Sequence, residues 1–442
     1  MASSRRKFLK RASLAGVGLG MAPMLSAFPK ARANDHITVA IMGVRSRGRH
    51  LAQVFAAQPN ARVAYVCDVD QRYLDRCVEE VTNVQDKAPK GEKDIRRVVE
   101  DPELDAVVIA APDHWHTPAA LLALAAGKHV YVEKPCSHNP REGEMLVEAQ
   151  QKTGLVVQMG NQRRSYPNVR ACMERLHGGL IGKVYHAKAW YANRRESIGH
   201  GQETSVPDYL DFELWQGPAP RTVYRDNIHP YNWHWFKRWG TGEALNNGTH
   251  EVDLARWGLQ EEYPEQVSAS GGRYHYDDDW EFPDTLTFSC TYANGKMLSW
   301  EGRSRQPYPI HGHSRGNMFH GTEGSCLLTG NDYVFYNLDG EVIAESKDEE
   351  VAASDATNTV SPAAGLDGIH VANFLEGIRS GATLASPIEQ GHRSVLTCQL
   401  GNIAWSSGQT LHLNTSTGRL QNGGAAEKLW SRDYAPGWEP EV

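Results

Sequence analysis

The first third of the chain alternates short apolar runs with segments of helical spacing. Nearly continuous apolar runs without polar alternation are expected of parallel strands that are buried on both faces. Between them, stretches such as 117–127 and 140–152 have the apolar spacing of helices. This alternation predicts an α/β, doubly wound parallel sheet of the Rossmann type over residues 34–160. Its expected strands span 36–43, 61–68, 105–112, 129–135 and 155–160.

The pattern changes after residue 160, where strand-like segments follow one another in runs. Gly and Asn separate many of them, and Ala293-Asn294-Gly295 is typical of a tight hairpin turn. We therefore predict a second, α+β domain over residues 161–442, in which helices lie on one side of an open, mostly antiparallel sheet. Its expected strands span 183–191, 266–276, 285–292, 296–302, 325–328, 333–337 and 341–345.

The first residues are basic and resemble an export signal. Arg5-Arg6-Lys7-Phe8-Leu9-Lys10 is similar to the address that the twin-arginine pathway reads. A glycine-broken apolar run over 12–28 is too short for a comfortable membrane span, and Ala31-Arg32-Ala33 has the pattern of a signal peptidase site. We expect residues 1–33 to be a twin-arginine signal peptide, which the twin-arginine translocon would bind, and the mature protein to be periplasmic. The alternative is a chance basic tail before a buried helix.

Charge and cysteine content exclude several classes of protein. Residues 1–33 hold seven of the 46 Lys and Arg and none of the 53 Asp and Glu, which leaves the mature chain with a net charge of −14. Such an acidic protein is a poor candidate for nucleic acid or anionic membrane surfaces. The seven cysteines are scattered without a Cys-x-x-Cys pair. We expect small buried side chains rather than a disulfide framework or a metal site.

The first strand-to-helix turn carries a glycine-rich loop, Gly43-Val-Arg-Ser-Arg-Gly48. In a Gly-x-Gly-x-x-Gly loop the first glycine permits the tight turn and the last allows close helix packing, so that helix amides face a pyrophosphate. Arg replaces the middle glycine here, and its guanidinium would meet a phosphate instead. The alternative is a plain turn. The predicted contacts to a dinucleotide are Gly43, Arg45, Ser46, Arg47 and Gly48.

Asp68 ends the second predicted strand, 25 residues after Gly43. A carboxylate at this position accepts hydrogen bonds from the ribose hydroxyls and repels a 2′-phosphate, which favours NAD over NADP. The alternative is a simple turn residue.

Several motifs resemble one oxidoreductase family. Glu133-Lys134-Pro135, the stretch 111–116 (Ala-Pro-Asp-His-Trp-His) and the stretch 240–253, which ends in Thr-His-Glu-Val-Asp, resemble motifs of the Gfo/Idh/MocA oxidoreductases. Segments 210–220 and 388–393 are similar to exported bacterial members, and the match runs from about residue 37 to 415. The resemblance implies that NAD lies beside Pro112, His116, Glu133 and Lys134.

The same resemblance implies that Lys134 and His250 flank the reacting carbon of a sugar or polyol. Oxidation of an alcohol needs a base for the hydroxyl proton while hydride leaves. His250 opens a predicted helix whose dipole favours the neutral imidazole. Asp253, one turn further on, would orient the ring, and Lys134 would stabilise the forming alkoxide. For His250 alone, a hydrogen-bonded helix cap is the alternative.

One position departs from the family pattern. Many dehydrogenases of the family have Asp four residues before the histidine, where this chain has Asn246. An amide still holds substrate or water but cannot ionise, which bears on the proton relay and on the net reaction.

Two further segments supply candidate substrate contacts. The aromatic-rich stretch 229–239 contains Trp233 and His234, and aromatic faces stack on sugar C–H groups. A core or subunit-contact loop is the alternative. Arg163 follows the last Rossmann strand near the expected cleft, with a solvated surface charge as its alternative.

Together these features predict an exported NAD(P)-dependent oxidoreductase that acts on a carbohydrate or polyol. The periplasm holds little free nucleotide, so we expect tightly bound NAD. One alternative is an NAD-dependent glycosidase that uses transient oxidation, elimination, hydration and re-reduction. A second is a carbohydrate-binding protein with a relic cofactor fold. We also expect a homodimer or homotetramer, because an uncovered apolar sheet face is an aggregation hazard.

Overall fold

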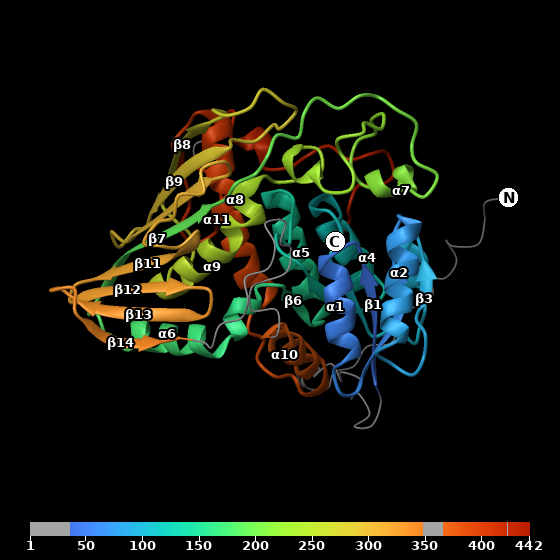
Figure 1. The fold of residues 1–442 in the computed structure, drawn as a ribbon, viewed down its shortest axis with the longest axis horizontal. Coiled ribbons are helices and arrows are strands. Elements are labelled where there is room, and N and C mark those ends of the chain that lie inside the picture. Colours follow the sequence, from blue (N-terminus) through green and yellow to red (C-terminus); the bar gives the residue numbers. More distant parts are fainter. Residues whose placement is uncertain (1–35, 348–365, 422) are drawn as a thin grey trace, which may run out of the picture.

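The computed structural model describes residues 36–347, 366–421 and 423–442 (Figure 1). The expected signal peptide, residues 1–33, lies outside the described residues. None of the helices in the described ranges combines the length and the apolarity that crossing a membrane requires.

The N-terminal sheet has six parallel strands in the order β3-β2-β1-β4-β5-β6. This confirms the predicted doubly wound arrangement, with β1 at the centre. The short edge strand β3 was not predicted, because Lys-Gly-Glu carries no apolar signal. The strands are β1 (Ile37–Met42), β2 (Ala61–Cys67), β3 (Lys90–Glu92), β4 (Ala106–Ile109), β5 (His129–Val132) and β6 (Val157–Met159).

Helices cover both faces of this sheet. Val39 and Ile41 of β1 pack with α1 (Arg47–Ala56), α2 (Gln71–Thr82) and α10 (Asp367–Ser380). Ala40 and Met42 point the other way, towards α4 (Asp113–Ala125) and α5 (Pro140–Thr153). Successive strand side chains point to opposite faces, so an apolar run in β1 serves both cores. A one-turn helix, α3 (Ile95–Val98), follows β3.

The second sheet has nine strands in the order β14-β13-β12-β11-β7-β10-β9-β8-β15, and β7–β10 is its parallel pair. The sheet is therefore mostly antiparallel, as predicted. Its strands are β7 (Val184–Ala192), β8 (Gln266–Gly272), β9 (Thr285–Thr291), β10 (Met297–Arg303), β11 (Arg315–Gly321), β12 (Gly324–Thr329), β13 (Asp332–Asn337), β14 (Val342–Ser346) and β15 (Leu411–His412).

Three helices lie on one side of this sheet, and the other side is open in Figure 1. They are α6 (Pro167–His177), α9 (Gly248–Leu259) and α11 (Ile388–Ser407). The predicted hairpin joins β9 to β10, where Gly295 has a φ of 81° that a side chain would disfavour. β11 was not predicted, because its sequence Arg-Gly-Asn-Met-Phe-His-Gly contains residues that are depleted in strands.

A long connection between β7 and the one-turn helix α8 (Glu243–Asn246) runs back to the N-terminal sheet. We call residues 193–239 the strap; it includes α7 (Phe212–Gln216) and the 3-10 helix η2 (Asn232–Trp235). In Figure 1 it arches over the top of the molecule from the second sheet to α2. The Gln71 amide donates to Tyr209 O at 2.9 Å, and the Asp211 amide donates to Val69 O at 3.0 Å.

All seven cysteines are buried and none is in a disulfide. This confirms the expectation of small buried side chains.

Candidate active site

A cavity of about 720 Å³ lies at the carboxyl ends of the N-terminal strands. Ligands of open α/β sheets bind at this edge, where the strand order reverses. The glycine loop and β2 line one part of the cavity, and β7, α9 and the strap line the rest. The structure therefore brings the predicted nucleotide and substrate residues to one place. Those that line the cavity are Gly43, Arg45, Ser46, Arg47, Asp68, Pro112, His116, Glu133, Lys134, Arg163, Trp233, His234, Asn246 and His250.

The glycine loop fits a dinucleotide. Gly43 has a φ of 82°, and an added Cβ would lie 2.5 Å from the Ala111 backbone. A Cβ on Gly48 would overlap the Gly43 carbonyl oxygen. Arg45 Nε and Arg47 Nη2 are buried and have no hydrogen-bond partner among the described residues. Two unpaired cationic donors beside a tight glycine turn suit a pyrophosphate.

Asp68 lies at the end of β2 and shapes the same part of the cavity. Its carboxylate accepts the amides of Val44 at 2.6 Å and Asp70 at 2.9 Å. Burial raises the pKa of Asp68 to about 6, although these hydrogen bonds act in the opposite direction. An oxygen of this buried carboxylate can still accept a ribose hydroxyl, since each oxygen has two lone pairs.

Arg47 and Glu133 were predicted as cofactor contacts and lie against each other. Arg47 Nε donates to Glu133 Oε1 at 2.7 Å, and its Nη1 donates to Asp367. Most of this guanidinium therefore joins α1, β5 and α10, and Nη2 is the donor that remains for a phosphate.

His116 lines the cavity, and its ring lies against backbone carbonyl groups. Its two ring nitrogens lie 2.6 Å from Pro135 O and 2.7 Å from Ala111 O. His116 was predicted to lie beside the cofactor; it lines the cavity, and its ring nitrogens face these two backbone carbonyls.

Lys134 reaches across from the end of β5 to α8. Its Nζ donates to the Asn246 carbonyl oxygen at 2.5 Å and lies 3.4 Å from Asn246 Oδ1. Burial lowers the pKa of Lys134, while the nearby carboxylates of Glu133 and Asp113 offset part of this shift. The ammonium is therefore placed by Asn246.

His250 lies in the first turn of α9 and lines the cavity. Burial lowers its pKa well below the usual value, and the cations Lys134, Arg315 and Arg163 lower it further. The imidazole is consequently neutral near pH 7, which is the form that accepts a proton.

Asp253 was expected to orient the His250 ring, and the structure corrects this. Its carboxylate accepts from Arg164 Nε at 2.7 Å, Arg164 Nη2 at 2.8 Å and Ser394 Oγ at 2.6 Å. Asp253 thus joins α9 to the segment after β6 and to α11. The i, i+3 spacing places it on α9 but does not decide which neighbour it contacts.

Arg163 lines the cavity but is held by protein groups. It donates to Glu251 Oε2 at 2.7 Å and, through Nη2, to Gly330 O at 2.7 Å. Arg315 donates to the other oxygen of Glu251 at 2.7 Å. Two arginines share one buried glutamate, which leaves net positive charge beside His250.

Trp233 and His234 form one surface of the cavity. Their rings stack with centroids 3.6 Å apart, and His234 Nδ1 lies 2.6 Å from Tyr231 O. Burial lowers the pKa of His234 well below its usual value. A neutral, stacked aromatic pair suits the C–H face of a sugar ring.

Other cavity residues were not predicted. The polar run Asn193-Arg194-Arg195 at the end of β7 could have indicated Asn193 and Arg195, since loops at strand ends carry sites. Arg315 gave no signal, because β11 itself was not predicted. The residues missed include Tyr191, Asn193, Arg195, Trp215 and Arg315.

The chain is similar to known proteins in both of its domains. The model of the oxidoreductase family with an NAD-binding Rossmann fold matches residues 37–161, and the GFO/IDH/MocA C-terminal domain model matches 213–327. A glycosyl hydrolase family 109 protein of Saccharopolyspora erythraea is 31% identical over 217 residues, 44% of this chain and 47% of that protein. The chain thus spans about half the length of that relative.

Two relatives match over a longer range. A glycosyl hydrolase family 109 protein of Parabacteroides distasonis is 24% identical over 367 residues, 76% of this chain and 78% of its own length. An alpha-N-acetylgalactosaminidase of Tannerella forsythia is 24% identical over 371 residues, 75% of this chain and 77% of its own.

Solved structures share the fold. Levoglucosan dehydrogenase in complex with NADH and levoglucosan has a TM-score of 0.65 at 18% identity, over 86% of this chain and 99% of that one. A putative myo-inositol dehydrogenase of Sinorhizobium meliloti 1021 has a TM-score of 0.61 at 18% identity, over 85% and 99%. The two family models, the shared fold and the Glu133-Lys134-Pro135 motif beside a glycine loop show that the chain belongs to the Gfo/Idh/MocA family of NAD-binding oxidoreductases.

Proposed function

We propose that the protein oxidises a hydroxyl group of a sugar, glycoside or polyol with a resident NAD. The observation that carries this proposal is that Lys134 and His250 line the same cavity as the glycine loop and Asp68. Gly43, Arg45, Gly48 and Asp68 would hold the dinucleotide, and its nicotinamide supplies the hydride acceptor when bound.

The side chains would divide the remaining work. A neutral His250 accepts the hydroxyl proton, and its lowered pKa keeps it ready to do so. The Lys134 ammonium, held by Asn246, stabilises negative charge on the substrate oxygen. Trp233 and His234 orient the ring. Asp68 favours NAD, since a 2′-phosphate beside a carboxylate is repelled.

Glycoside cleavage by transient oxidation is the second candidate, and Asn246 favours it. An oxidised sugar has an acidic C–H next to its carbonyl, so that a base removes that proton and the aglycone leaves. Water then adds, and the hydride returns to the sugar. A neutral amide at position 246 removes one ionisable group from the relay of a net dehydrogenase. Relatives named glycosyl hydrolase family 109 protein and alpha-N-acetylgalactosaminidase support this candidate.

We further propose that the protein is exported by the twin-arginine pathway and works in the periplasm. Arg5-Arg6 and Ala31-Arg32-Ala33 support this proposal. The pathway carries folded proteins, so the chain would close around NAD before export. Retention without exchange asks for a nanomolar or tighter Kd, about −12 kcal/mol.

The test is a nucleotide assay followed by a substrate panel. Mature protein purified without added nucleotide is expected to release close to one nicotinamide dinucleotide per chain on denaturation. Glycosides and free sugars are then incubated with and without added NAD. Stoichiometric NADH formation identifies net oxidation, whereas aglycone release without nucleotide consumption identifies glycoside cleavage. Sugar binding that survives removal of nucleotide, without turnover of any panel member, would refute both and favour a relic binding protein.

A further inference from the structure

The strap and the nucleotide loop face each other across the cavity. Arg45 of the loop lies with its Cζ 5.5 Å from the Tyr231 ring centroid, and Tyr73 of α2 lies 6.5 Å from the His229 ring. Leu214, Trp215 and Tyr231 of the strap line the same cavity as Gly43 and Asp68. A dinucleotide that enters or leaves on this side must pass the strap.

The strap is fastened to the N-terminal domain near Asp70. Leu210 forms a β-bridge with Asp70, and two backbone hydrogen bonds join 209–211 to 69–71. The guanidinium of Arg72 lies 3.4 Å above the Tyr209 ring centroid. These contacts hold the tip of the strap next to the strand that ends in Asp68.

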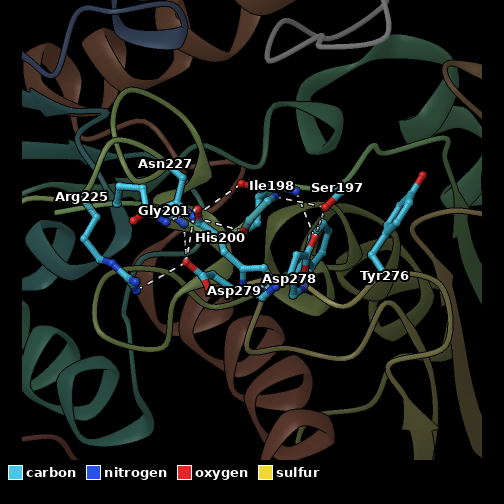
Figure 2. A network of polar contacts seen from close by, with 12 residues as sticks. Ser197, Ile198, His200, Gly201, Arg225, Asn227, Tyr276, Asp278 and Asp279 are labelled. Atoms are coloured by element: carbon cyan, nitrogen blue, oxygen red, sulfur yellow. Dashed lines mark hydrogen bonds and ion pairs between the residues drawn. The ribbon is translucent and has the colours of Figure 1, made fainter. Parts of the chain in front are cut away.

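A second set of contacts to the strap comes from two adjacent aspartates, Asp278 and Asp279, in the loop between β8 and β9. Figure 2 shows Asp278 facing Ser197 and Ile198, to which it is joined by hydrogen bonds of 2.8 and 3.0 Å. The Asp278 side chain is fully buried, and it also pairs with Arg273 at 2.5 Å. The limb of the strap that leaves β7 is the outgoing limb, and the limb that leads to α8 is the returning limb. Asp278 therefore connects the outgoing limb to the second sheet.

Asp279 contacts both limbs of the strap at once. On the outgoing limb it accepts from His200 Nδ1 and the Gly201 amide, each at 2.9 Å. On the returning limb it accepts from Asn227 Nδ2 at 2.9 Å, and Arg225 Nη1 lies 3.4 Å away (Figure 2). Burial would raise the pKa of Asp279, but these hydrogen bonds outweigh it and the pKa is lowered. Asp279 is consequently ionised and holds the two limbs together.

We propose that Asp278 and Asp279 are positioning residues that keep the strap closed over the nucleotide, so that release of NAD requires these contacts to break. Neither aspartate lines the cavity, so an effect on the nucleotide would be transmitted by the strap. Neutralising them removes charge-assisted hydrogen bonds, which are about twice as strong as neutral ones. The inference rests on the proposed resident NAD and adds the device that retains it.

The experiment compares nucleotide release from three proteins. Bound NADH is chased with excess NAD, and its fluorescence is followed at a temperature where circular dichroism shows every protein folded. Asp278→Asn/Asp279→Asn is expected to release NADH at least about tenfold faster than wild type. The matched control is Asp277→Asn, which neutralises the exposed neighbour in the same run of three aspartates and is expected to match wild type.

A second variant keeps the test decisive if the double substitution does not fold. Asn227→Ala removes a returning-limb contact to Asp279 and is expected to accelerate release in the same direction by a smaller factor. A purely structural role would lower the unfolding midpoint and leave release from the folded protein unchanged. Equal release rates in wild type and the folded variants would overturn the proposal that Asp278 and Asp279 keep the strap closed. If wild type purifies empty, the resident cofactor is wrong, and the same chase with added NADH still compares the strap variants.

Discussion

At the scale of single residues, the site depends on how burial sets protonation. His250 and Lys134 line one cavity, and burial lowers the pKa of both. For His250 the surrounding cations act in the same direction as burial. In the proposed reaction, a neutral His250 would accept a proton beside cations that stabilise charge developing on the substrate oxygen.

Replacing His250 with Ala is expected to remove nearly all turnover, because the general base is lost. A general base contributes about 10²–10⁴-fold. Steady-state kinetics and the nucleotide content of the purified variant are measured together, and the content is expected to remain unchanged. A loss of turnover below about tenfold would contradict the assignment of the base.

The acidic limb of the pH profile is expected to lie below the usual histidine range. A lowered pKa means that His250 stays unprotonated as the pH falls through about 6.5, so kcat/KM remains flat there and declines only at lower pH. Arg315→Met is expected to move the limb to higher pH, because it removes a cation that lowers this pKa. A wild-type limb centred near 6.5 would argue against a buried base.

Replacing Asp68 with Ala is expected to shift preference towards NADP. The carboxylate that repels a 2′-phosphate is removed, while the glycine loop is retained. Dissociation constants for NAD and NADP are measured for apoprotein of both forms. Unchanged discrimination would show that Asp68 serves only to hold the Val44 and Asp70 amides.

At the scale of elements, α9 carries His250, the proposed base, and is anchored by three ion pairs. Asp253 pairs with Arg164, and Glu251 pairs with Arg163 and Arg315. These contacts join α9 to the segment that follows β6 and to β11. They set the depth at which His250 enters the cavity.

Asp253→Asn is expected to act on stability rather than directly on catalysis. It leaves the buried Arg164 without its counter-charge, and breaking a buried pair costs about 3–5 kcal/mol. Urea unfolding gives the change in the free energy of unfolding, with His250→Ala as the comparison. Unchanged stability with strongly reduced turnover would restore the orienting role that the contacts of Asp253 argue against.

At the scale of the whole molecule, no helix of the described residues covers the open face of the second sheet. His186 and His320 stack on this face with centroids 5.4 Å apart, and Lys188 pairs with Glu301 at 3.2 Å. Next to them, Trp190, Met318 and Leu327 form an apolar cluster that is buried, with Ile310 and Tyr336 packed against it. Met297, which is in register with His186, is exposed on this face. A mixed polar and apolar surface of this kind suits contact between subunits.

We expect a second copy of the chain to cover this face, in a homodimer or homotetramer. Multi-angle light scattering of the mature protein at micromolar concentration is expected to give a multiple of the chain mass. Met297→Asp places a charge on this face, where Met297 is exposed and in register with His186, and is expected to shift the mass towards the monomer. A monomeric wild type would contradict the prediction.

The sequence by itself determined the N-terminal sheet, the character of the second sheet and the two central side chains. Continuous apolar runs, glycines at the first strand-to-helix turn and a tight hairpin turn are local signals, because each depends on neighbours within a few residues. Lys134 and His250 were found through motifs, and the cavity contains both. The short strands β3 and β15 and the glycine-containing β11 carried too little local signal to be predicted.

Only the tertiary structure decided which polar groups are available to a ligand in the cavity and which are bonded to other protein groups. Asp253 was predicted to orient His250, but it meets Arg164 and Ser394. His116 lines the cavity, where its ring nitrogens lie against two backbone carbonyls. The strap reaches the nucleotide loop through contacts between segments far apart in the chain. A buried polar side chain must find a partner wherever the fold places one, and that partner has no fixed spacing in the sequence.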